Sequence, residues 1–370
     1  MGDKKCEVKE PIYYASVLVE TLMRKFRAEE LPPPGHFHYH QGVFLSGVHK
    51  TYEICGDERY FQYVKDWVDS CIDEKGKILN YDSGQLDDLQ PGILLYPLLD
   101  RTGDTRYRKA LDTILPIIRD FPRNEEGGFW HKEEHPNQMW LDGLYMAGPI
   151  CAEYGNRFDT PEYFDLVAEQ ALLMEKKTKD KKTGLLYHAW DCSKEMGWAD
   201  PTTGLSPEFW GRSIGWVPVA VLDELDFLPK NHLQYKELQR MVRQLLEAVC
   251  RYQSPEGRWY QVVDKGDRPD NWLETSCSCL FVAALCKAVR AEILPKEYLS
   301  QARKGYEGVI ASLGREGEDL LVGNVCIGTG VGDYDHYIHR PTSVNDLHGA
   351  GAFLIMCAEM QKVWQELNML

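Results

Sequence analysis

The sequence predicts an all-α protein built as a closed ring of six helical hairpins, an (α/α)6 barrel. Two kinds of helical segment indicate this, because they alternate strictly along the 370 residues. A hydrophobic share of 44% is ample for a substantial core. We therefore expect residues 1–370 to form a single domain.

The first kind of segment begins with an acidic or turn-forming residue and a tyrosine, followed by apolar residues at helical spacing. In residues 56–73 the apolar positions Tyr60, Val64, Trp67 and Val68 fall on one face, and charged residues fill the other. Such amphipathic segments predict helices on the outside of the ring. The six are residues 13–26, 56–73, 103–121, 160–174, 232–249 and 295–313.

The second kind of segment is apolar on nearly all sides and rich in small residues, which is typical of a helix surrounded by protein. The six are residues 42–55, 89–102, 138–155, 212–228, 275–294 and 345–364. An open solenoid of the same hairpins is the alternative, but its inner helices would meet water and need more polar residues. The pattern therefore favours a closed barrel.

Short aromatic segments precede several of the buried helices. They are residues 127–134, 183–191 and 256–267, in which a glycine is followed by alternating aromatic and polar residues. This alternation predicts small β-ribbons or extended loops at one rim of the barrel.

The charge balance limits the classes of partner. With 57 acidic and 42 basic residues the formal net charge is −15, which argues against nucleic acid and anionic membranes as partners. No run approaches the ~20 apolar residues of a membrane span, and the first residues do not resemble a signal peptide. Eleven cysteines scattered among apolar positions favour reduced core thiols. We therefore expect a cytoplasmic protein, and the sequence leaves the oligomeric state open.

Unusual polar residues gather where the buried helices begin. In a ring of hairpins the inner helices run the same way, so their N-terminal ends meet at one mouth, where free N–H groups favour anions. Each such residue also has a structural explanation, as a helix cap or a hydrogen-bonded core histidine. The residues are Tyr39, His40, Asp87, Asp88, Asp142, Arg212, Trp216, Glu274, Asp346 and His348.

Asp142 stands apart because its neighbours Trp140, Leu141, Leu144 and Tyr145 are apolar or aromatic. An unpaired buried carboxylate costs several kcal/mol, so such a group is normally neutralised, paired or used in chemistry. A helix cap needs no such surroundings. We interpret Asp142 as a catalytic acid.

The predicted rim is rich in tryptophan, at positions 130, 140, 210 and 216. Aromatic rings stack on the C–H faces of sugars while polar side chains bind their hydroxyl groups. Tryptophans that fill a wide barrel are the alternative interpretation. Lys132, His188 and Arg212 lie among the aromatics and supply local positive charge, which suits an acidic sugar.

Seven motifs together resemble the unsaturated rhamnogalacturonyl hydrolases of glycoside hydrolase family 105. They are "HYHQGVF", "GGFWHK", "QMWLDGLYMAGP", "TGLLYHAWD", "SPEFWGRSIGW", "VDKGDRPDNWLE" and "NDLHGAGAF", and they span nearly the whole chain. The resemblance implies a six-hairpin α/α barrel as one catalytic domain. It also implies a substrate in which a galacturonate with a C4=C5 double bond, left by a pectin lyase, is linked to rhamnose.

The resemblance carries functional residues over by motif. It implies Asp142 as the catalytic aspartate and Asp87, rather than Asp88, as its partner. The substrate-binding positions that it implies are Tyr39, Lys132, Trp140, His188, Trp210, Arg212 and Trp216. No metal or organic cofactor is expected, since the sequence contains neither a phosphate-binding loop nor a metal-ligand cluster at recognisable spacing.

Hydration of an enol ether needs a proton on C4 and a water oxygen on C5, and one carboxyl group can donate the first proton and accept the second from water. To donate near neutral pH, Asp142 needs a pKa roughly two or three units above ~3.9. Its apolar flanks and the like charge of Asp87 both predict an upward shift. The product, a hemiketal, opens to a keto sugar and releases the aglycone without a covalent intermediate.

Three alternatives stay open from the sequence. The related unsaturated glucuronyl hydrolases share the barrel and act on glycosaminoglycan fragments. A conventional inverting glycosidase would use Asp87 and Asp142 as base and acid. A non-catalytic helical-repeat scaffold would bind protein in its concave face. The cationic residue that holds the uronate carboxylate cannot be assigned among Arg212, His188 and Lys132.

Overall fold

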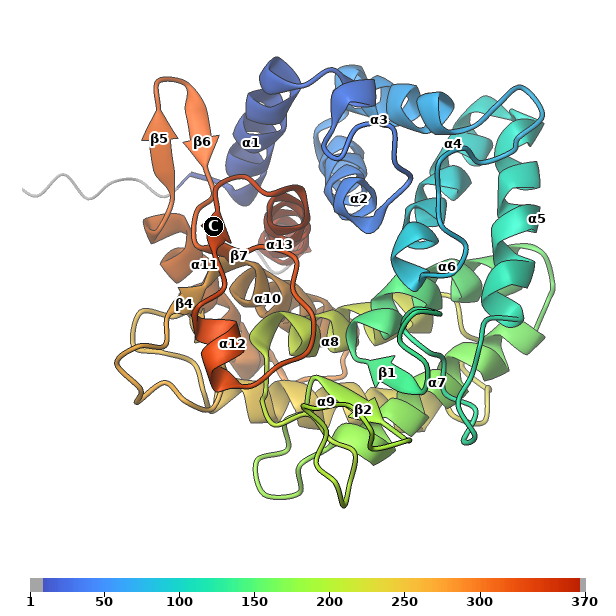
Figure 1. Cartoon of the computed structure of the whole chain (residues 1–370). Helices are drawn as coiled ribbons and strands as arrows, with labels where there is room; N and C mark the ends of the chain where they lie inside the picture. Colours follow the sequence, from blue (N-terminus) through green and yellow to red (C-terminus); the bar gives the residue numbers. More distant parts are fainter. Residues whose placement is uncertain (1–8, 367–370) are drawn as a thin grey trace, which may run out of the picture.

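The computed structural model describes residues 9–366 and shows a closed ring of inner helices (Figure 1). Each inner helix contacts the next, from α2 through η3, α6, α8 and α10 to α13, and α13 returns to α2. This closure confirms the barrel and excludes the open solenoid. The inner helices are α2 (Tyr39–Cys55), α4 (Leu95–Thr102) with the preceding 3-10 helix η3 (Gln90–Leu94), α6 (Asp142–Arg157), α8 (Gly211–Leu225), α10 (Thr275–Arg290) and α13 (Leu347–Glu366).

Six outer helices surround this ring, as the amphipathic segments predict. Each buries one apolar face against its neighbours, as α3 does with Tyr60, Val64, Trp67 and Val68. Asp57 caps α3 by accepting a hydrogen bond from the backbone N–H of Arg59. The outer helices are α1 (Pro11–Lys25), α3 (Glu58–Cys71), α5 (Thr105–Arg119), α7 (Glu162–Thr178), α9 (Tyr235–Cys250) and α11 (Leu299–Ala311). Within residues 9–366, every helix is too short or too polar to span a lipid bilayer.

The second inner segment is less regular than the sequence pattern indicates. It begins as the 3-10 helices η2 (Leu86–Asp88) and η3, and only its last eight residues form the α-helix α4. Pro97 lies in the first turn of α4, where a proline lacks the N–H group and its ring disfavours an α-turn before it. Gly92 also packs against Ile150, whose Cδ1 lies 2.4 Å from where a Cβ on Gly92 would be.

Close packing of inner helices rests on small residues at the contacts. Between α2 and α13, a Cβ on Gly351 would lie 2.5 Å from the carbonyl oxygen of Val43, and one on Gly47 would lie 2.6 Å from Cβ of Leu354. The two backbones therefore approach closely only because both positions are glycine. This contact joins the first and last inner helices.

Short antiparallel strand pairs lie in the connections between the helices (Figure 1). Strand β1 (Gln138–Trp140) pairs with β2 (Ala189–Asp191), and β3 (Trp259–Tyr260) pairs with β4 (Leu273–Glu274), so two of the three predicted aromatic segments contribute strands. Residues 127–134 form only isolated bridges, through Phe129 and Lys132. The remaining elements are β5 (Gly314–Glu316), β6 (Asp319–Leu321), β7 (Val325–Cys326), β8 (Thr342–Ser343), α12 (Tyr334–Ile338), η1 (Ala28–Glu30) and η4 (Lys296–Tyr298).

Candidate active site

A cavity of about 340 Å³ opens among the N-terminal ends of α2, α6 and α8. The polar residues at these helix starts, the loop that carries Lys132 and the segment before α12 all contribute to its wall. Of the residues singled out by family resemblance, eight line the cavity and the ninth, His188, contacts Asp142 from behind the wall. The eight are Tyr39, Asp87, Lys132, Trp140, Asp142, Trp210, Arg212 and Trp216.

Asp142 is the first residue of α6, and only Leu141 separates it from the ribbon strand β1. Its side chain is 13% exposed, and its Oδ2 lies 3.1 Å from Nε2 of His188, a side chain with no exposed surface. No other described group bonds to this carboxylate, so its Oδ1 has no partner, and Asp142 lines the cavity. Asp142 is thus held at one oxygen and available at the other.

The His188 ring connects Asp142 to a tyrosine on the short helix α12. Nδ1 of His188 lies 2.6 Å from the hydroxyl of Tyr337, which also accepts a hydrogen bond from the backbone N–H of Gly332. Burial raises the pKa of Tyr337 far above its usual range, so the hydroxyl keeps its proton and donates it to Nδ1. The ring proton of neutral His188 must then lie on Nε2, where it is donated to Asp142.

The charge state of Asp142 corrects the expectation from sequence. Burial raises the pKa of Asp142, but the hydrogen bond that His188 donates, together with smaller contributions from His131 and Arg212, leaves it below its ordinary value. Burial lowers the pKa of His188, which favours the neutral ring. The prediction of a raised pKa was wrong for the free protein, because the sequence does not reveal the histidine that bonds to the carboxylate. Asp142 is ionised at neutral pH.

Asp87 is held more tightly than Asp142. Its Oδ1 lies 3.3 Å from Nε2 of His131, and its Oδ2 lies 3.1 Å from Nζ of Lys132. Burial raises the pKa of Asp87, but the charge and hydrogen bond of His131 and the charge of Lys132 hold it well below its usual range. The adjacent Asp88 turns away to His38 and to the backbone N–H of Asp82.

Aromatic rings form the walls of the cavity. Trp140 stacks on His131 with ring centroids 4.5 Å apart and on His135 at 5.3 Å. On the α8 side, the Trp216 ring stacks on Tyr145 at 4.4 Å, and the Arg212 guanidinium lies 4.5 Å from the Trp210 ring centroid. Flat walls of this kind suit the C–H faces of a sugar ring.

The three basic residues predicted from the sequence to bind the uronate all have protein partners. Lys132 pairs with Asp87 and His188 bonds to Asp142, while Arg212 donates to the backbone carbonyl oxygens of Cys326 and Ile327. A fourth basic residue, Arg340, also lines the cavity, and one of its nitrogens donates to the carbonyl oxygen of Gly328. Its Nε is buried without a partner among the described residues.

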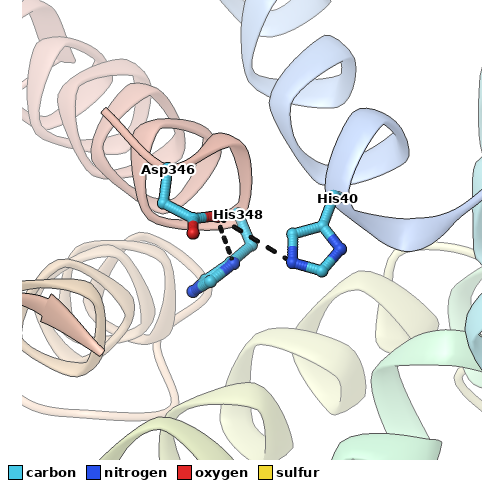
Figure 2. Close-up of side chains that lie close together, drawn as sticks. All are labelled: His40, Asp346 and His348. Atoms are coloured by element: carbon cyan, nitrogen blue, oxygen red, sulfur yellow. Dashed lines mark ion pairs between the residues drawn. The ribbon is translucent and has the colours of Figure 1, made fainter. Parts of the chain in front are cut away.

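Besides Asp88, three of the conspicuous polar residues at helix starts lie outside this arrangement. Glu274 caps α10, because its carboxylate accepts hydrogen bonds from the backbone N–H of Cys277 and Cys326 and from the hydroxyl of Ser276. It has the structural role of a cap. Asp346 and His348 lie beside His40, where α13 meets α2 (Figure 2).

Sequence reasoning missed three residues of the site. His131 has a weak signal, since it precedes Lys132 in "FWHK". Tyr337 and Arg340 have none, because they belong to an irregular segment between β7 and β8 that no periodic pattern describes. The fold brings this segment over the cavity, and a sequence pattern does not contain that information.

Two comparisons decide the family. Residues 14–364 match the model of Glycosyl Hydrolase Family 88. The structure of a Clostridium acetobutylicum ATCC 824 glycoside hydrolase from family 105 superposes with a TM-score of 0.89 at 35% identity, over 94% of this chain and 99% of the other. The chain belongs to the glycoside hydrolases of families 88 and 105. It is therefore an enzyme.

Other relatives extend this result. The unsaturated rhamnogalacturonyl hydrolase YesR of Bacillus subtilis is 27% identical over 333 residues, which is 88% of this glycoside hydrolase and 90% of YesR. An unsaturated glucuronyl hydrolase from Bacillus sp. GL1, responsible for the degradation of glycosaminoglycan, has a TM-score of 0.72 at 15% identity, with 97% of each chain covered. At that identity the second comparison shows a shared fold alone.

Proposed function

We propose that this glycoside hydrolase releases a 4,5-unsaturated galacturonic acid from rhamnose in small breakdown products of rhamnogalacturonan. The support for this substrate is the similarity to YesR over nearly the whole chain and the family 105 relative. The aromatic walls and the cations of the cavity suit a sugar that carries a carboxylate.

The observation that carries the proposal is the unequal setting of the two aspartates. Asp87 has a cationic or imidazole partner at each oxygen, whereas Oδ1 of Asp142 has no partner among the described residues. A conventional inverting glycosidase needs a second carboxylate that activates water, and Asp87 is poorly placed for that work. One available carboxyl group fits hydration of a double bond, in which the same group transfers a proton twice.

In the proposed reaction Asp142 donates a proton to C4, and C5 then receives the oxygen of a water whose proton returns to Asp142. The C5 hemiketal opens to a ketone, and the anomeric carbon loses the rhamnose. Atoms balance with one water consumed, and no bond forms between enzyme and sugar. Asp87 stays ionised and, with Lys132 and His131, orients the substrate hydroxyl groups.

The lowered pKa of Asp142 means that the free enzyme must gain a proton before it can donate one. Substrate binding favours this protonation of Asp142, because a uronate carboxylate brings negative charge close to Asp142 and the sugar excludes water. Both effects raise the pKa of the carboxyl group. Proton uptake is thus coupled to binding of the substrate.

The test compares three disaccharides with the purified enzyme. We expect loss of the ultraviolet absorbance of the double bond with unsaturated galacturonyl-rhamnose, at a kcat/KM at least 100-fold above that for an unsaturated glycosaminoglycan disaccharide. The saturated galacturonyl-rhamnose should stay intact. Hydrolysis of the saturated disaccharide would contradict the hydration chemistry, and a preference for the glycosaminoglycan disaccharide would contradict the proposed aglycone.

A further inference from the structure

Three potential metal ligands meet where the ring of inner helices closes (Figure 2). His40 belongs to the first turn of α2, while Asp346 directly precedes α13 and His348 lies in its first turn. One ligand atom from each of the three lies within 4.8 Å of the others. The cluster is separate from the Asp142 and Asp87 interactions described above, although His40 also lines the cavity.

The hydrogen bonds of His348 leave one ring nitrogen available as a ligand. His348 has no exposed surface, and its Nε2 lies 3.0 Å from the carbonyl oxygen of Cys326, an acceptor that requires the proton on Nε2. Nδ1 of a neutral ring then carries a lone pair. This nitrogen points at the cluster, 2.7 Å from Oδ1 of Asp346, yet it has no partner in hydrogen-bonding alignment.

This arrangement matches the usual support of a histidine metal ligand. Such a ligand donates its second ring N–H to a carbonyl or carboxylate group, which fixes the tautomer and the orientation of the ring. The Cys326 carbonyl provides that contact for His348. Two imidazole nitrogens and one carboxylate oxygen form a ligand set that suits Zn²⁺ and related transition metals.

We propose that His40, Asp346 and His348 form a site for Zn²⁺, with water as the fourth ligand, that joins the first and last inner helices. Ligand atoms around tetrahedral zinc at ~2.1 Å lie about 3.4 Å apart. Oδ1 of Asp346 is 2.7 Å from Nδ1 of His348 and 3.9 Å from Nε2 of His40. These two distances bracket the required value, and the ligand nitrogens of His40 and His348 lie within 4.8 Å of each other, so the side chains must rotate to bring all three onto one ion.

The competing arrangement has no metal. A doubly protonated His348 would donate to both Cys326 and Asp346 as a buried ion pair. Arg212, whose guanidinium donates to the same Cys326 carbonyl, opposes added positive charge nearby, and it therefore opposes a doubly charged Zn²⁺ more than a singly charged imidazolium. Against the ion pair stand the misaligned Nδ1 of His348 and the position of the His40 nitrogen on the same side of Asp346.

The test measures zinc binding directly, without reference to activity. The full chain is treated with a chelator, dialysed and titrated with ZnCl₂ by calorimetry. We expect one zinc bound per chain and a melting temperature raised by ~5 °C at saturation, because a ligand that binds only the folded state stabilises it. The variants are His40→Ala, which removes a partly exposed ligand, and Asp346→Asn. The control is His36→Ala, at an exposed histidine outside the cluster.

Substitution with Co²⁺ distinguishes metal bound at this site from metal bound by the cysteines. Co²⁺ in the proposed site should give visible ligand-field bands without the ultraviolet charge-transfer band of a thiolate. Zinc binding and the melting shift should be lost in His40→Ala and kept in His36→Ala. Absence of stoichiometric binding to the wild-type chain, or equal binding by the wild type and His40→Ala, would overturn the proposal and leave the His348–Asp346 ion pair.

Discussion

Nε2 of His188 lies 3.1 Å from Oδ2 of Asp142, and this contact sets the charge of the carboxylate in the proposed reaction. A neutral histidine with its proton on Nε2 stabilises the ionised aspartate and leaves its other oxygen unbonded. The carboxylate can therefore accept a proton, and it must take one up before it can act as a proton donor.

Replacement of the carboxyl group tests the role of Asp142. Asp142→Asn keeps the shape of the side chain and can still accept the hydrogen bond from His188, but it cannot transfer a proton. We expect kcat to fall about 1,000-fold, which corresponds to ~4 kcal/mol of transition-state stabilisation. Circular dichroism should show an unchanged fold. An equal loss in Asp66→Asn, an exposed aspartate on α3, would point to a general effect.

The pH dependence tests the coupling between proton uptake and binding. Because the pKa of Asp142 is lowered in the free enzyme, the protonated fraction falls about tenfold for each pH unit above it. We expect kcat/KM to rise as the pH falls from about 8 to about 5. Calorimetry in buffers of different ionisation enthalpy should show uptake of a proton on binding of the unsaturated disaccharide. A kcat/KM that stays flat over this range would contradict the coupling.

Removal of the Tyr337 hydroxyl tests the tautomer of His188. Tyr337→Phe deletes the donor to Nδ1, so the ring can move its proton away from Nε2 and weaken the bond to Asp142. We expect kcat to fall about tenfold, the equivalent of one hydrogen bond of ~1.4 kcal/mol, with KM nearly unchanged. Nitrogen NMR of His188 should show a changed tautomer. Tyr334→Phe on the same helix is the matched control, because its hydroxyl bonds to Asp270 instead.

The sequence predicts the barrel well, because the spacing of apolar residues indicates whether each helix faces solvent on one side or is surrounded by protein. The apolar face of α3 and the uniformly apolar α8 can be recognised without any partner. The irregular start of the second inner segment, in η2 and η3, was not predicted: Pro97 is visible in the sequence, but the close packing of Gly92 against Ile150 is not. Local propensity describes each helix but not how closely it packs.

The candidate site is predictable in part for a similar physical reason. Residues such as Asp142 and Arg212 lie at fixed positions on inner helices, so the ring alone brings them to one mouth. The charge state of Asp142 depends on His188 and Tyr337, whose contact spans 149 positions in the sequence. Pairings of this range come from the tertiary fold, and the pKa of a buried group follows from such pairings.

The buried Glu224 predicts a second effect of pH, on stability. Its two carboxylate oxygens have no partner among the described residues, and burial, with the charge of Asp223, raises its pKa well above the usual value. The folded chain therefore keeps a proton that the unfolded chain releases above about pH 4.5, so stability falls by ~1.4 kcal/mol per pH unit from there toward the folded pKa. Glu224→Gln should reduce the slope measured by urea denaturation between about pH 5 and 8, while Glu153, whose pKa burial raises to about 7, continues to contribute. The exposed Glu74→Gln should leave the slope unchanged.

The close contact between α2 and α13 at Gly351 predicts the effect of a larger side chain on stability. A Cβ at position 351 would lie 2.5 Å from the oxygen and 2.6 Å from the carbon of the Val43 carbonyl, so the backbone of one helix must move to accept alanine. We expect Gly351→Ala to lower the free energy of unfolding by about 3 kcal/mol, measured by urea denaturation. Gly197→Ala is the matched control, since nothing lies within 4 Å of its added carbon. Equal stability of the two variants would mean that the ring closes with more space than this geometry shows.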